Sequence, residues 1–256
     1  MDSQLTKEYD SQGGRYSEYT AHAPFAKIET ELFRSALGDC TGLTVLDLGG
    51  GSGLKAREAV DLGAAAVDVV DMSAQMMRAG QEVEKSLGRE GAVIAWHKGD
   101  ITKSLAHLPL RPSYDLVLVG WTFDHAHDLA EYEAMWRNAA AYLKPGGRFV
   151  SVRVGDPRGA SWDGRYGVVS SALKETADGV HYRYTLLLDP PLEFEASSIN
   201  LSMAGNTELP ERYGFTDFSS INPEDMSVVK ADPNFWKPFV DNPGFVIFQA
   251  KKRSDA

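Results

Sequence analysis

Short apolar runs alternate with stretches of helical periodicity along the first half of the chain. Almost unbroken apolar runs lie at 45–48, 66–70, 92–97 and 114–119. Such runs are typical of strands that are buried on both faces of a sheet. Apolar residues recur at helical spacing at 54–62, 76–87 and 129–143. The alternation predicts an α/β fold in which a parallel sheet carries helices on both faces.

The flanking segments extend this pattern into one large domain. Apolar residues at helical spacing follow Pro24 and end at Gly38, so a helix is expected over 24–37. A glycine-rich loop at 155–167 precedes the remaining elements, which are expected strands at 180–188, 194–201, 213–218 and 244–251 and a helix beginning at Asp232-Pro233. We expect a single domain over 1–256.

Composition and charge exclude several functional classes. The chain has 256 residues, 43% of them hydrophobic, and a formal charge of -10. Acidic surfaces disfavour nucleic acid and anionic membranes, and the longest basic run is Lys251-Lys252-Arg253. The single Cys40 excludes an internal disulfide and a multi-cysteine zinc site. Because the N-terminus is polar and no apolar run approaches about 18 residues, we expect a cytoplasmic protein.

A glycine-rich turn follows the first predicted strand. An apolar run ends in Asp47-Leu48, and four of the next five residues are glycine. Glycine permits a sharp turn and a close approach of the backbone to a ligand. Gly51-x-Gly53-x-x-Ala56 fits a dinucleotide fingerprint, with Asp71 as the acid about 20 residues on. A carboxylate at Asp47 would repel a pyrophosphate, however, whereas it suits a sulfonium and an ammonium. A turn without a ligand is the remaining alternative.

Four segments in order resemble the class I S-adenosylmethionine-dependent methyltransferases. Residues 45–53 match their motif I, an apolar-apolar-acid-apolar-Gly-x-Gly-x-Gly pattern. Asp71, Gly99-Asp100-Ile101 and the Leu-Lys-Pro-Gly-Gly run at 143–147 follow in the family's order. A dehydrogenase would match only the first two of these four. The resemblance covers residues 43–154 and implies a Rossmann-like, seven-stranded, mostly parallel sheet with helices on both faces and an antiparallel last strand.

The resemblance also implies S-adenosylmethionine as the cofactor and assigns residues to it. Tyr9-Asp10 and Tyr16 are similar to a Y-D-x5-Y segment that covers the cofactor in many small-molecule members. Asp71 lies at a strand's carboxyl end, where it can accept both ribose hydroxyls. The expected cofactor-binding residues are Tyr9, Tyr16, Asp47, Gly49, Gly51, Asp71, Met72, Asp100, Ile101 and Gly120. A helix-capping role for Asp71 and a turn role for Asp100 stay open.

Residues 120–127 follow the fourth predicted strand, where methyl donor and acceptor should meet. His125 matches the histidine of an H-x-x-D pattern in many family members and is the candidate general base, with a structural histidine as the alternative. The expected acceptor-binding residues are aromatic: Tyr19, Trp121, Phe123, Trp162, Tyr166 and Tyr184. Packing within the core of an inserted hairpin is the alternative for about half of the aromatic side chains in these loops and strands. No metal site is expected from the acids and histidines near residue 125.

The expected function is methyl transfer from S-adenosylmethionine to a small aromatic or apolar metabolite, at oxygen or nitrogen, by in-line displacement. The run at 188–194 looks like a hairpin of small-molecule methyltransferases related to the ubiquinone and toxoflavin pathway enzymes. Two alternatives remain, a protein that binds the cofactor for another purpose and an NAD-dependent oxidoreductase.

The chain then divides into an N-terminal lid and helix at 1–38, a cofactor-binding core at 43–154, a substrate-covering insertion at 155–207 and closing strands at 208–256. The only expected partner is the small-molecule acceptor, without nucleic acid or membrane, and a homodimer is left open.

Overall fold

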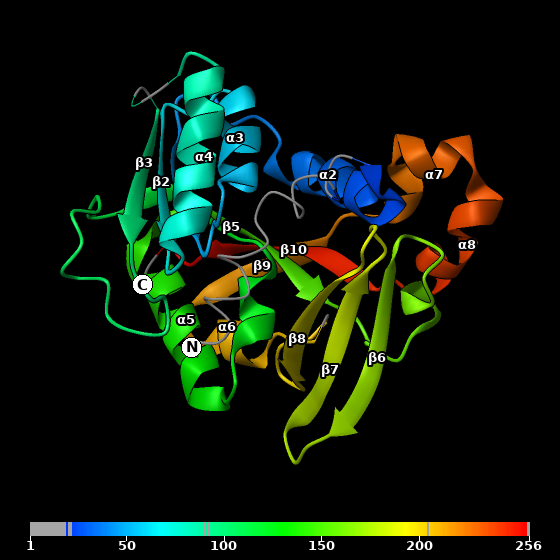
Figure 1. Ribbon diagram of the computed structural model, residues 1–256. Helices are drawn as coiled ribbons and strands as arrows, with labels where there is room; N and C mark the ends of the chain where they lie inside the picture. Colours follow the sequence, from blue (N-terminus) through cyan, green and yellow to red (C-terminus); the bar gives the residue numbers. More distant parts are fainter. Residues whose placement is uncertain (1–18, 20–21, 90, 92, 204, 255–256) are drawn as a thin grey trace.

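The computed structural model describes residues 19, 22–89, 91, 93–203 and 205–254 (Figure 1). Its main sheet has seven strands in the order β3-β2-β1-β4-β5-β10-β9. They are β1 (Thr44–Leu48), β2 (Ala66–Asp71), β3 (Ile94–Lys98), β4 (Tyr114–Val119), β5 (Leu143–Val154), β9 (Phe215–Ser220) and β10 (Phe245–Lys252). The pairs among β1 to β5 are parallel, whereas β10 is antiparallel to β5 and to β9. The predicted sheet with its antiparallel last strand is therefore confirmed.

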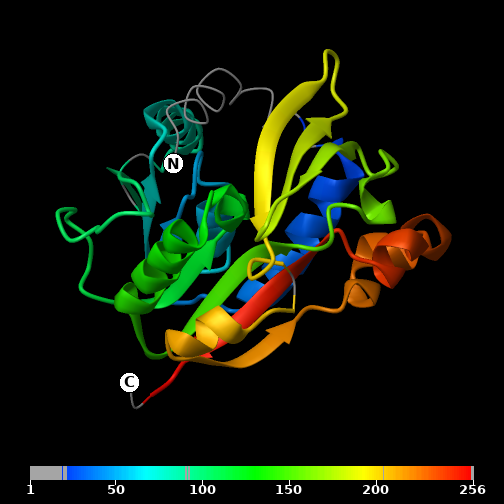
Figure 2. The same ribbon diagram turned by 90° about the horizontal axis from the view of Figure 1, so that it is seen from below.

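Helices cover both faces of this sheet, as the alternation predicted. They are α2 (Pro24–Leu37), α3 (Leu54–Asp61), α4 (Ala74–Ser86), α5 (Leu129–Tyr142), α6 (Glu208–Arg212), α7 (Ser227–Ala231) and α8 (Pro233–Asp241). Figure 2 shows α5 and α6 on one face and α2 on the other. Because successive strand residues point to opposite faces, Val45 packs in the core with α2 and α3, and Leu46 packs in the core with α5.

Local sequence signals account for several helix starts. Ser73 accepts a hydrogen bond from the Met76 N–H and caps α4. Asp128 accepts from the Glu131 N–H before α5, and Asp232 accepts from the Phe235 N–H before α8. Each cap satisfies a backbone donor that the helix itself leaves unpaired. These caps hold the helices against the sheet and fix the loops that precede them.

A second, antiparallel sheet stands beside the main one (Figure 1). It consists of β6 (Val168–Glu175), β7 (Gly179–Leu186) and β8 (Leu192–Ile199), in that order. The expected hairpin corresponds to β7 and β8, but the sequence did not predict β6. Only Val168 of β6 is buried and its last four residues are exposed, so its sequence carries no apolar alternation. Its strand conformation depends on pairing with β7.

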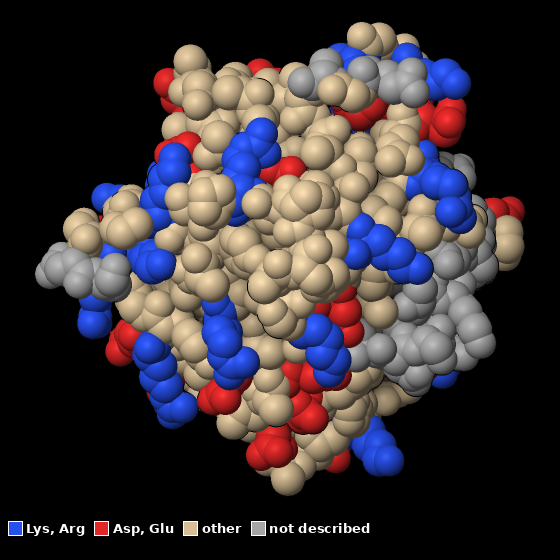
Figure 3. All heavy atoms as spheres, turned by 90° about the vertical axis from the view of Figure 1, so that its left-hand side faces the viewer, with Lys and Arg blue, Asp and Glu red and all other residues tan. Residues whose placement is uncertain are grey.

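The described residues were also compared with the requirements of a membrane span and of a metal site. None of the described helices is both long and apolar enough to cross a bilayer. The described histidine, cysteine and acidic residues form no group suited to hold a metal ion. On the face in Figure 3, lysine and arginine side chains are scattered among acidic and uncharged ones. Three 3-10 turns complete the structure: η1 (Trp121–His125), η2 (Ala160–Trp162) and η3 (Pro223–Asp225).

Candidate functional site

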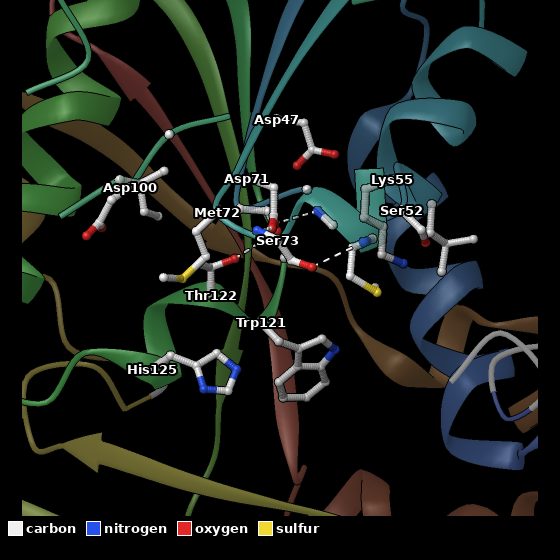
Figure 4. Close-up of a pocket in the computed structure, with 18 of the residues that line it drawn as sticks. Asp47, Ser52, Lys55, Asp71, Met72, Ser73, Asp100, Trp121, Thr122 and His125 are labelled. Atoms are coloured by element: carbon white, nitrogen blue, oxygen red, sulfur yellow. Dashed lines mark hydrogen bonds between the residues drawn. The ribbon is translucent and has the colours of Figure 1, made fainter. Parts of the chain in front are cut away.

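A cavity lies at the carboxyl ends of β1, β2 and β4, where the strand order reverses (Figure 4). Such a switch point is the usual ligand site of an open α/β sheet. We call it the first cavity. Its lining includes all eight expected cofactor-binding residues that the structure describes: Asp47, Gly49, Gly51, Asp71, Met72, Asp100, Ile101 and Gly120. The other two, Tyr9 and Tyr16, lie outside the described residues.

Steric contacts require glycine at positions 49, 50 and 53 of the glycine turn. Gly49 has a φ of +71°, and a Cβ atom there would overlap the side chain of Thr122. A Cβ atom on Gly50 would overlap the Asp47 carboxylate. The turn is held to β2 by the Gly49 N–H, which donates to the Val70 carbonyl at 2.7 Å. The backbone therefore lies bare along one wall of the first cavity.

Asp47 is a buried carboxylate with no partner in the described protein. It is 0% exposed, and neither carboxylate oxygen has a hydrogen bond to a described residue. Burial raises the pKa of Asp47 to about 7, the charge of Asp71 adds to the rise, and the charge of Lys55 opposes it. An unpaired buried carboxylate is costly. Its position in the first cavity fits a ligand that brings a cation.

Asp71 and Asp100 each accept hydrogen bonds within the protein and also line the first cavity. Asp71 accepts from the Gly51 N–H at 2.8 Å and from the Ser73 N–H at 2.7 Å. A carboxylate oxygen can accept more than one hydrogen bond, so these backbone contacts are compatible with recognition of ribose hydroxyls in the first cavity. Asp100 accepts from the N–H and hydroxyl of Thr102, which is the turn role that the sequence left open. Both residues nevertheless line the first cavity.

An ion network beneath the first cavity was missed in the sequence. The Lys55 ammonium lies 3.0 Å from Glu29 and 3.4 Å from Glu58, and all three side chains are nearly buried. Burial opposes the charge of Lys55, but Glu29 and Glu58 together raise the pKa of this lysine. Glu29 also accepts from the Trp121 indole N–H at 3.1 Å. The sequence signal that could have indicated this network is Glu29, a glutamate on the otherwise apolar face of the helix 24–37.

A second cavity adjoins the first and is walled by α2, η1, η2 and the second sheet. Three residues line both cavities: Glu29, Trp121 and His125. Figure 4 shows Trp121 and His125 together on one side of the first cavity. The rest of the second cavity is lined by Tyr19, Phe25, Asp124, Trp162, Val168, Tyr184, Leu186, Phe194 and Ala196. Four of the six expected acceptor residues thus line it: Tyr19, Trp121, Trp162 and Tyr184.

The structure corrects the prediction for the other two expected acceptor residues, Phe123 and Tyr166, because neither lines the first or the second cavity. Phe123 is 2% exposed and packs its ring against Trp136 at 4.8 Å in the core beneath α5. Tyr166 is fully buried and stacks on Trp236 at 4.8 Å. Residues adjacent on a short turn point in different directions, so Trp121 faces the cavities while Phe123 faces the core.

Two titratable neighbours on η1 have strongly altered acidity. Burial lowers the pKa of His125 to about 4, with a further decrease from the charge of His127. His125 is therefore a neutral imidazole at pH 7 and can accept a proton, but its lowered pKa makes it a weak base. Burial raises the pKa of Asp124 to about 8, and the charge of Arg153 opposes that rise. Asp124 was not among the expected site residues.

The comparison with known families concerns the segment that lines the first cavity. Residues 45–147 match a family model described as a methyltransferase domain. This segment runs from β1 to the start of β5 and contains every lining residue of the first cavity except Glu29. Residues 45–147 are thus similar to a methyltransferase domain, and S-adenosylmethionine is the cofactor that fits the buried carboxylate of Asp47.

Solved structures share this fold across almost the whole chain. An S-adenosylmethionine-dependent methyltransferase from Mesorhizobium loti is 22% identical, with a TM-score of 0.57, covering 86% of this chain and 95% of its own. CalS10, an S-adenosylmethionine-bound amino pentose methyltransferase from Micromonospora echinaspora, is 14% identical, with a TM-score of 0.55 and coverage of 93% and 95%. The cyclase SpnF is 14% identical, with a TM-score of 0.60 and coverage of 98% and 95%. A search of curated proteins gave no match.

Proposed function

We propose that this protein transfers a methyl group from S-adenosylmethionine to a small molecule with an aromatic or apolar body. The observation that supports this most is the junction of the two cavities at Trp121 and His125. One cavity holds the expected cofactor residues, and the other has aromatic walls. A flat apolar acceptor in the second cavity would meet the donor at the shared residues.

The residues at the junction fit a one-step displacement. S-adenosylmethionine, when bound, supplies an electrophilic methyl group on a sulfonium. The walls of the second cavity align the acceptor's oxygen or nitrogen in line with the bond that breaks and exclude water. The neutral ring of His125 can take the proton that the nucleophile loses. Glu29 fixes the Trp121 indole through its 3.1 Å hydrogen bond and so shapes the junction.

The finer family assignment and the cellular setting are part of the same proposal. Residues 188–194 cover most of the connection between β7 and β8 and the start of β8, in the sheet that walls the second cavity, which supports a relation to the ubiquinone and toxoflavin type of methyltransferase. We propose a cytoplasmic enzyme whose partner is its small-molecule acceptor. The fold neighbour SpnF is a cyclase, so a non-methylating reaction with the same cofactor is the second candidate.

Ligand-dependent melting tests the proposal directly. S-adenosylmethionine and S-adenosylhomocysteine at about 100 times their dissociation constant should stabilise the protein by about 2.7 kcal/mol. For a chain of this size that is a rise of about 5–10 °C in Tm. NAD and NADP should give no rise, and a rise with NAD alone would contradict the assignment. The protein is then incubated with S-adenosylmethionine and phenols, amines or carboxylates. Release of S-adenosylhomocysteine indicates methyl transfer, whereas a non-methylating reaction would release none.

A second test addresses the acceptor wall. Trp162 lines only the second cavity, so Trp162→Ala should raise the KM for the acceptor while the Kd for S-adenosylmethionine is unchanged. Trp121 lines both cavities, so Trp121→Ala should weaken both ligands. Because Trp162 is 3% exposed, its alanine variant also loses about 3–5 kcal/mol of stability. Trp162→Phe is the control that retains packing. Normal acceptor kinetics in both Trp162 variants would place the acceptor elsewhere.

A further inference from the structure

Asp124 is a buried carboxylate that neither the fold nor the first cavity uses. It is 3% exposed, and neither of its oxygens has a hydrogen-bond partner among the described residues. It lines the second cavity but not the first. Buried polar groups almost always have partners, so an orphaned carboxylate facing a cavity indicates a ligand that supplies the partner.

Arg153 does not supply that partner, although its charge reaches Asp124. No ion pair joins the two side chains within the described structure, and the guanidinium already has other acceptors. It donates to the carbonyl oxygens of Leu201, Ser202, Met203 and Asn206. Its face packs on the Phe248 ring. The Asp124 carboxylate is therefore available to a ligand.

Aromatic rings line the second cavity together with Asp124. The Trp162 ring lies 5.0 Å from Phe25 and 4.8 Å from Tyr184, and Phe25 lies 5.8 Å from Trp121. The faces of such rings attract cations as well as apolar groups. Among the described residues that line the second cavity there is no lysine or arginine. The cavity is therefore complementary to a positive charge.

The Tyr184 hydroxyl offers a ligand an acceptor, whereas the Tyr19 hydroxyl, which has no hydrogen-bond partner among the described residues, can also donate. The Tyr184 hydroxyl donates to the Tyr182 hydroxyl at 3.2 Å, and Tyr182 pairs with the Ser198 hydroxyl at 2.8 Å. Tyr184 thus uses its hydrogen within the protein and presents lone pairs to the cavity. A ligand that donates N–H groups would satisfy both Tyr184 and Asp124.

We propose that the methyl acceptor is an amine with an apolar or aromatic body, whose protonated nitrogen pairs with the Asp124 carboxylate in the second cavity. This inference rests on the proposed function and narrows it from oxygen or nitrogen to nitrogen. An alcohol or phenol offers one donor and no charge, so it would leave most of the acceptor lone pairs on Asp124 unsatisfied.

The same contact prepares the nitrogen for reaction. An ammonium has no lone pair, so one N–H proton passes to the Asp124 carboxylate and leaves a neutral amine. Asp124 takes this proton in preference to His125, because burial raises the pKa of Asp124 and lowers that of His125. The freed lone pair forms the new N–C bond while the C–S bond breaks and its electrons stay on sulfur. The positive charge moves to the methylated nitrogen. Burial raises the pKa of Asp124 to about 8 in the free protein, so the carboxylate that receives this proton forms as the pH approaches 8 or when the ammonium binds beside it.

Matched amines and alcohols test the inference in the full chain saturated with S-adenosylhomocysteine. The probes are benzylamine, 2-phenylethylamine and tryptamine, each compared with the alcohol of the same skeleton by calorimetry. We expect at least one amine to bind about ten- to hundredfold more tightly than its alcohol, the effect of one charge-assisted hydrogen bond. With S-adenosylmethionine in place of the product, mass spectrometry should then find the N-methylated amine.

Two variants assign the preference to one side chain. Asp124→Asn keeps the shape but removes the charge, and it should abolish the preference for amines while the affinity for S-adenosylhomocysteine is unchanged. Asp128→Asn is the matched control, because it removes a carboxylate at an exposed helix cap that asparagine can also cap. It should retain the preference.

The outcomes separate this inference from the function on which it rests. If no amine binds better than its alcohol, or if Asp124→Asn retains the preference, the amine assignment is overturned. If S-adenosylhomocysteine itself fails to bind the wild-type protein, the proposed function fails, and the amine assignment fails with it.

Discussion

Asp71→Ala is expected to lower the affinity for S-adenosylmethionine about hundredfold. The variant loses a charged acceptor for two ribose hydroxyls, and each such hydrogen bond contributes about 1.5–3 kcal/mol. It also loses the 2.8 Å bond that holds the Gly51 N–H in the glycine turn. Titration calorimetry measures the change. An unchanged affinity would leave Asp71 with only its backbone contacts.

A ligand-side control separates ribose recognition from distortion of the turn. The wild-type protein should bind the 2′-deoxy analogue of S-adenosylhomocysteine more weakly than S-adenosylhomocysteine itself. Asp71→Ala should not distinguish the two ligands, because the carboxylate that recognises the hydroxyl is gone. If the variant still distinguishes them, the loss of affinity comes from the turn and not from the ribose contact.

The parts of the site that depend on local chain geometry could be predicted from sequence. The glycine turn and Asp71 follow directly from strand ends, and their position in a sheet is fixed by the parallel topology. The turn at Gly49 needs a positive φ that only glycine adopts easily, so it leaves a clear mark in the sequence. The helix caps at Ser73 and Asp128 could be predicted for the same reason, because each joins residues only three positions apart.

The parts that depend on distant contacts could not be predicted. Glu29 and Trp121 are 92 positions apart in the chain, and no periodic pattern links them. Trp121 and Phe123 lie on the same short turn, and only the packing of α5 and the second sheet decides which one faces a cavity. The sequence did not single out Asp124 as a site residue, because its burial depends on segments far along the chain.

The affinity for S-adenosylmethionine is expected to fall about tenfold for each pH unit below about 7. Burial raises the pKa of Asp47 to about 7 in the free protein, so below that pH the carboxyl is protonated. The facing charges of Asp71 and Glu58 raise this pKa, and that of Lys55 lowers it. A bound cation requires the ionised carboxylate. Binding at low pH must therefore release one proton, which weakens it.

Calorimetry at pH 5.5 to 7.5 in two buffers of different ionisation enthalpy measures that proton directly. Near pH 6 the wild-type protein should release close to one proton for each cofactor bound. Asp47→Asn should bind more weakly at pH 7.5 but release almost no protons, because its amide does not titrate.

Comparison with S-adenosylhomocysteine, which keeps the ammonium and lacks the sulfonium, shows which of the two cations pairs with Asp47. Equal proton release with both ligands assigns Asp47 to the ammonium, and release with S-adenosylmethionine alone assigns it to the sulfonium. No proton release with either ligand would mean that Asp47 stays protonated in the complex and binds as a neutral hydrogen-bonding group.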